Sequence, residues 1–91
     1  MDLNEFRIKI DKIDDEIIRL FKKRMAVSEE IALYKRERSL PIFDPARERK
    51  KLYEAESKVE EEHRGHIAAL FSVLFEASRA EQERVLNSGG K

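Results

Sequence analysis

The stretch that decides the fold is residues 3–38, LNEFRIKIDKIDDEIIRLFKKRMAVSEEIALYKRER, which contains neither glycine nor proline. Its apolar residues recur with a period near seven. They form two adjacent rows, one of Ile10, Ile17 and Ile31 and one of Phe6, Ile13, Leu20, Val27 and Tyr34. This periodicity predicts one long amphipathic helix with an apolar stripe.

The predicted length of this helix indicates a second copy of the chain. At ~1.5 Å per residue the helix spans roughly 50 Å, whereas a small domain is only ~30 Å wide. The remaining residues are too few to cover such a stripe. We therefore expect part of it to pack against another copy, in an obligate homodimer with the long helices together.

The rest of the chain reads as two shorter helices. Residues 39–43, SLPIF, interrupt the first pattern, and Asp44-Pro45 is typical of a helix start, with Asp as N-cap and Pro at the first helical position. We expect helices over about 3–38, 45–62 and 66–86, a turn at 63–65 and a flexible tail at 87–91. No strand pattern is present, so the prediction is a single all-α domain over residues 1–91.

Composition narrows the functional class. The 91 residues carry 19 basic and 19 acidic side chains and no cysteine. A net charge of zero provides no global field for nucleic acid or an anionic membrane, and the lack of thiols excludes disulfides and thiolate metal sites. No apolar run approaches the ~20 residues of a membrane span, and no signal sequence is recognisable. We expect a cytoplasmic protein with neither nucleic-acid nor membrane partners.

Four polar side chains occupy positions where the helical pattern calls for apolar ones. Arg24 falls in the isoleucine row of the first helix, Glu48 faces inward in the second, and Ser78 and Gln82 continue the apolar stripe of the third. A buried charge costs several kcal/mol unless it is paired. Their gathering in one interior predicts a polar pocket built for a ligand.

Further cations of the first helix extend this pocket. Arg24 and Lys35 are eleven residues apart, about 20° in azimuth and roughly 16 Å along the axis, so they can hold opposite ends of one small molecule. Arg7 lies about 25 Å from Arg24 by the same rise and can reach the pocket only from a partner subunit. Taken singly, Arg7 and Lys35 also fit solvated surface positions, and Arg24 also fits a register-setting polar residue.

The full set of residues resembles the all-α (AroQ-type) chorismate mutases over nearly the whole chain. The matching elements, in order, are Arg7-x6-Asp14, Ile17-Ile18-x-Leu20-x3-Arg24, Lys35, Pro41-Ile42-x-Asp44-x2-Arg47-Glu48 and Ser78-x3-Gln82. No single element is specific, but their order and the helix lengths agree with the family. The resemblance implies an intertwined homodimer of three-helix chains, with two sites that are each completed by an arginine of the partner.

The resemblance also implies a reaction, the Claisen rearrangement of chorismate to prephenate in phenylalanine and tyrosine biosynthesis, which needs no cofactor and no metal. By this resemblance, Arg24 and the partner's Arg7 bind the substrate carboxylates, and Ser78 assists them. Lys35 and Gln82 donate hydrogen bonds to the ether oxygen. Glu48 accepts a hydrogen bond from the ring hydroxyl, and Asp44 lies nearby through its backbone. Arg47 either touches the substrate or orders Glu48.

Three other interpretations remain open at this point. An isochorismate pyruvate-lyase shares the fold and a similar cationic pocket, although Glu48 favours the mutase. A non-catalytic helical dimerisation module would leave the inward polar residues unexplained. The third is a fused or regulatory role, because the Gly89-Gly90 ending fits a severed linker as well as a free-standing enzyme.

Overall fold

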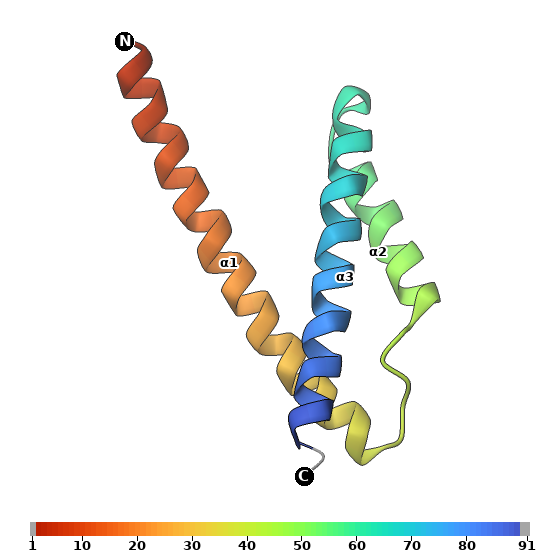
Figure 1. Ribbon diagram of the computed structural model, residues 1–91. Coiled ribbons are helices and arrows are strands. Elements are labelled where there is room, and N and C mark those ends of the chain that lie inside the picture. Colours follow the sequence, from red (N-terminus) through yellow and green to blue (C-terminus); the bar gives the residue numbers. More distant parts are fainter. Residues whose placement is uncertain (1, 90–91) are drawn as a thin grey trace.

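The computed structural model describes residues 2–89, which form three helices, a short 3-10 turn and no strand. Helix α1 spans Leu3–Glu37, α2 spans Pro45–Ser57, η1 spans Glu61–His63 and α3 spans Arg64–Gly89. The all-α class expected from the sequence is therefore confirmed. Helix α3 packs against both α1 and α2, and α1 extends well beyond them in a molecule of 55 × 28 × 13 Å (Figure 1).

The long helix begins and ends at local capping structures. Asp2 accepts the backbone N–H of Glu5, and Glu5 accepts the N–H of Asp2, which satisfies two free donors of the first turn. At the other end, Ser39 adopts a left-handed φ of 54°. The Leu40 N–H then bonds the Lys35 carbonyl at 2.9 Å, and the Ser39 N–H bonds Arg36. This arrangement is a Schellman motif, in which a residue other than glycine occupies the strained position.

The predicted start of the second helix is confirmed, but its predicted end is wrong. Asp44 is the N-cap and accepts the Arg47 N–H at 3.1 Å, with Pro45 at the first helical position. The helix ends at Ser57 rather than near residue 62. Arg64 donates at 3.2 Å to the Glu56 carbonyl, which also accepts the Val59 N–H, and so caps this end from the side. Three acidic residues then precede α3, where the positive end of the helix dipole favours them.

The third helix is longer than the sequence pattern predicted. It includes Arg64 and Gly65, which were expected in a turn, and residues 87–89, which were expected in the tail. Residues 90 and 91 of that tail lie outside the described part of the chain. No glycine or proline lies between Gly65 and Gly89, so the helix continues to the glycines near its two ends.

A single chain buries very little of its apolar surface. Its buried apolar residues are Ala32, Ala55 and Phe75, and every residue from 2 to 23 is exposed. Figure 1 shows the first half of α1 diverging from α3, in agreement with this exposure. Among the described helices, none combines the length and the apolar character that a membrane crossing requires.

Candidate active site

One cavity of about 420 Å³ lies where α1, α2 and α3 meet. Seven of the eight residues predicted from the sequence line it, namely Arg24, Lys35, Asp44, Arg47, Glu48, Ser78 and Gln82. The wall also contains apolar side chains from α1, α3 and the connection before α2: Val27, Ile31, Ile42 and Phe75. Residues spread over nearly sixty positions of sequence thus share one space.

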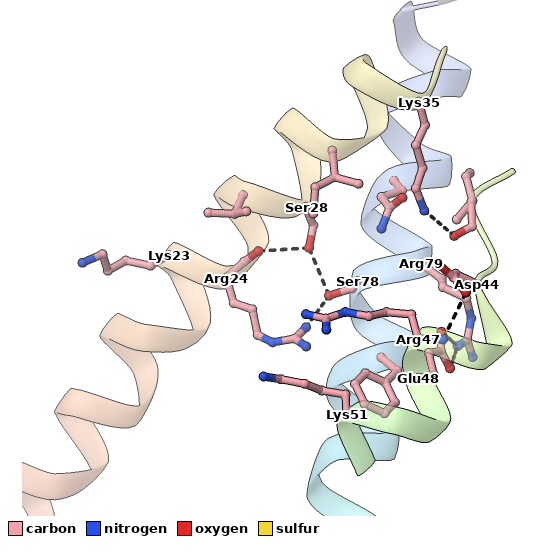
Figure 2. Close-up of a pocket in the computed structure, with 15 residues that line it drawn as sticks. Lys23, Arg24, Ser28, Lys35, Asp44, Arg47, Glu48, Lys51, Ser78 and Arg79 are labelled. Carbon is pink, nitrogen blue, oxygen red and sulfur yellow. Dashed lines mark hydrogen bonds and ion pairs between the residues drawn. The ribbon is translucent and has the colours of Figure 1, made fainter. Parts of the chain in front are cut away.

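Arg24 is fixed by α3 and faces another cation. Its Nη1 donates to the Ser78 hydroxyl and, at 3.3 Å, to the Leu74 carbonyl (Figure 2). Burial, together with the positive charge of Arg47, lowers the pKa of Arg24 from its ordinary value. Arg47 extends from α2 toward Arg24 in the same view. Two converging guanidinium groups are stabilised by an anion between them.

A serine that sequence analysis missed supports Arg24. Ser28 lies one turn after Arg24, is only 3% exposed and contacts both the Arg24 carbonyl, at 2.9 Å, and the Ser78 hydroxyl, at 3.0 Å. Each hydroxyl has one proton, so Ser28 donating to the carbonyl leaves Ser78 to donate to Ser28. Hydrogen bonds among these three residues therefore link α1 to α3. Ser28 could have been found from the sequence by its position four residues after Arg24, which places both residues on the same face of the helix.

Lys35 enters the cavity from the last turns of α1. Its ammonium group donates to the Ile42 carbonyl at 2.8 Å, in the connection before α2. An ammonium carries three donors, so two N–H groups remain for a ligand. Lys35 therefore positions the connection and presents a positive charge to the cavity at once.

Gln82 is a buried amide with an incomplete set of partners. Its side chain is 6% exposed, and its Oε1 has no hydrogen-bond partner among the described residues. A buried polar atom without a partner costs about 1–3 kcal/mol. An amide held in this way is positioned for a ligand that can use its hydrogen-bonding groups.

Two carboxylates of the cavity have different partners. Asp44 accepts the backbone N–H of Arg47 and so acts as a helix cap. Glu48 accepts from Arg79 of α3, which sequence analysis missed, through both of its carboxylate oxygens. With these carboxylates engaged, the lining cations Lys23, Arg24, Lys35, Arg47 and Lys51 leave the cavity positively charged. Lys23 points away from the other labelled cations in Figure 2.

Arg7 does not reach the cavity of its own chain. It lies in the exposed first half of α1, seventeen residues before Arg24, which corresponds to about 25 Å along the helix. The partner's contribution that the sequence predicted stays a prediction at this stage.

The fold and the cavity define an all-α protein with a cationic, partly apolar cavity between its helices. A profile of the chorismate mutase type II family matches residues 6–83. The chain therefore belongs to the chorismate mutase type II family, a family of isomerases, and the resemblance noted in the sequence is confirmed.

Two curated relatives agree with this assignment. The chorismate mutase of Methanocaldococcus jannaschii is 36% identical over 87 residues, which cover 92% of this chain and 87% of the relative. The bifunctional chorismate mutase/prephenate dehydratase of Aquifex aeolicus is 44% identical over 48 residues, which cover 53% of this chain and 13% of that protein. No solved structure matches the chain at a significant level.

Proposed function

We propose that this protein converts chorismate to prephenate, for phenylalanine and tyrosine biosynthesis, in a cavity built from two subunits. The observation that carries the proposal is the gathering of Arg24, Lys35, Arg47, Glu48 and Gln82 around one space of about 420 Å³. That volume is in the range of cavities that take small ligands. The positive charge matches a substrate with two carboxylates.

The two carboxylates of the substrate are bound by the two ends of the cationic wall. Arg24, held by Ser78, binds one carboxylate, and Arg7 of the partner subunit binds the other carboxylate from the open side of the cavity. Chorismate must fold into a chair before its enolpyruvyl carbon meets the ring. Cations fixed at separate positions hold that chair, which turns binding energy into orientation.

Lys35 and Gln82 act on the bond that breaks. Cleavage of the C–O bond builds negative charge on the ether oxygen, and the free N–H groups of the ammonium and the amide donate to that oxygen. Because these donors are fixed before the reaction, they stabilise the charge without reorganising. Glu48 accepts from the ring hydroxyl, and Asp44 and Arg47 shape the same end of the cavity. The rearrangement is unimolecular and requires no cofactor.

The homodimer belongs to the same proposal. Large apolar side chains of α1 remain exposed in the single chain, among them Phe6, Ile10, Ile13, Ile17 and Leu20. A monomer that left this stripe in water would forgo about 25 cal/mol for each Å² of apolar surface. A second copy covers the stripe and brings Arg7 to the open side of the cavity, in an intertwined pair with two equivalent sites.

A direct assay tests the activity. Purified protein in a buffer with a metal chelator is expected to consume chorismate, followed by its ultraviolet absorbance, and to form prephenate. Isochorismate is supplied in a parallel reaction. Release of pyruvate from isochorismate without any prephenate from chorismate would instead identify a lyase. Failure to act on either substrate, with no thermal shift from a bicyclic transition-state analogue, would leave a non-catalytic dimerisation module.

A further inference from the structure

Arg79 is the side chain that contacts Glu48 most closely. Its Nη1 donates to both carboxylate oxygens of Glu48, and the two side chains are 32% and 24% exposed. The pair joins α3 to α2 across 31 residues of sequence. A half-buried, charge-assisted contact of this kind is stronger and more directional than an ion pair in open solvent.

The same guanidinium group also contacts the connection that precedes α2. Its central carbon lies 5.1 Å from the centroid of the Phe43 ring, a cation–π distance. Phe43 follows Ile42, whose carbonyl accepts the ammonium of Lys35. Arg79 therefore lies at a junction of α3, α2 and the connection, and it contacts Glu48, which acts in the proposed mechanism.

Glu48 has no equivalent partner on its own helix. Arg47 extends toward Arg24 in Figure 2, and no hydrogen bond joins it to Glu48 among the described residues. A carboxylate held only by groups of α2 would be fixed relative to α2 alone. Arg79 fixes it relative to α3, the helix that also supplies Ser78 and Gln82 to the cavity.

We propose that Arg79 is a positioning residue for the reaction, acting through Glu48. This inference rests on the proposed function. One N–H shared between the two carboxylate oxygens leaves further lone pairs on each oxygen for a ring hydroxyl. Arg79 restricts rotation of the carboxylate, so its remaining acceptor directions stay fixed relative to α3, which also supplies Gln82 to the cavity. A misplacement of about 1 Å at such a group is enough to cost on the order of a hundredfold in rate.

A double-mutant cycle separates this role from direct or purely structural ones. The four proteins are the wild type, Arg79→Met, Glu48→Gln and the double variant, each assayed for kcat and KM with chorismate. We expect Arg79→Met to lower kcat/KM about tenfold in the wild type and less than twofold when Glu48 is already Gln. Equal fold losses in both backgrounds would overturn the inference, because Arg79 would then act independently of Glu48.

Conservative and control variants complete the test. Arg79→Lys keeps a cation near Glu48 and is expected to retain more activity than Arg79→Met; equal loss in the two variants would contradict a charge-assisted contact. Arg49→Met removes an exposed arginine beside Glu48 that does not line the cavity, and its kcat/KM is expected to stay within about twofold of the wild type. If circular dichroism shows that Arg79→Met does not fold, the same double-mutant cycle is carried out with Arg79→Gln in its place.

The activity of the wild type distinguishes a failure of the proposed function from a failure of the role proposed for Arg79. An inactive wild type would refute the proposed function. An active wild type with an additive cycle would refute only the role of Arg79.

Discussion

The Arg24 guanidinium and the Ser78 hydroxyl are hydrogen-bonded across the contact between α1 and α3, 54 residues apart in sequence. Ser28 touches both the Ser78 hydroxyl and the Arg24 backbone. The long, flexible side chain of Arg24 is thereby held at one place before any ligand binds. Such preorganisation reduces the entropy that a ligand must otherwise offset on binding.

Removing the Ser78 hydroxyl is expected to weaken the site. Ser78→Ala deletes the side-chain acceptor for Arg24 and the hydrogen bond between Ser78 and Ser28, so we expect kcat/KM for chorismate to fall about tenfold, equivalent to roughly 1.4 kcal/mol. Steady-state kinetics measure the change. Ser72→Ala is the matched control, because Ser72 is an exposed α3 serine that bonds only its own helix, at the Ala68 carbonyl. Equal losses in the two variants would rule out a special role for Ser78.

Changing Gln82 to an acid is expected to make the activity depend on pH. An amide donates at every pH, so the wild type should vary little between weakly acidic and mildly alkaline conditions. A carboxylate cannot donate until it is protonated, so Gln82→Glu should lose activity at neutral pH and regain it as the pH falls. Profiles of kcat/KM against pH record the shift.

The control for this experiment is Gln82→Met, which has no donor in any state and should be weak across the whole range. If Gln82→Glu kept wild-type activity at about pH 8, where a carboxyl group is ionised, Gln82 would have no donor role at the ether oxygen.

A charge in the apolar stripe of α1 is expected to separate the subunits. Ile17 is 57% exposed in the single chain and lies in the stripe proposed as the dimer interface. Ile17→Lys would bury an unpaired ammonium there, at a cost of several kcal/mol, so the protein should become monomeric and lose helicity. Sedimentation velocity and circular dichroism report both effects.

Glu16→Lys introduces the same residue one position away. Glu16 pairs with Arg19 on the exposed surface, where ion pairs contribute little, so this variant should remain dimeric. Dissociation of both variants alike would not support the proposed interface, and a monomeric wild type would contradict it.

Glycine at position 39 is expected to stabilise the end of α1. Ser39 has a left-handed φ of 54°, which is strained for a residue with a Cβ atom. Ser39→Gly should therefore raise the free energy of unfolding by about 0.5–1 kcal/mol, after the greater freedom of glycine in the unfolded chain is subtracted. Thermal melts measure the gain, and Ser39→Ala, which keeps the strain, should show none. A lower melting temperature for glycine than for alanine would contradict this account.

The long helix and the start of α2 could be predicted because their signals are local. Thirty-six residues without glycine or proline and a Pro after an N-cap Asp each specify structure within a few neighbouring positions. The end of α2 could not, since nothing between residues 57 and 62 breaks a helix. Its position depends on Arg64, which reaches back to the Glu56 carbonyl. A tertiary contact of this kind cannot be recognised from the local sequence pattern.

The site was predictable where polar residues interrupted an apolar stripe. Arg24, Glu48 and Gln82 stand out for that reason, and they line one cavity. Arg79 did not stand out, because an arginine on a helix flank is usually solvated and its partner is 31 residues away. The contribution of Arg7 depends on how a second subunit packs against α1, and the apolar pattern indicates that contact without specifying its geometry.

Mixing two inactive variants tests the two-subunit cavity most directly. Arg7→Ala and Arg24→Ala should each be dimeric and nearly inactive. After exchange of subunits, a hybrid dimer has one cavity with both arginines and one with neither, so an equal mixture should recover about a quarter of the wild-type activity. Native mass spectrometry establishes that hybrids have formed. Hybrids that form and show no activity would contradict a site shared between subunits.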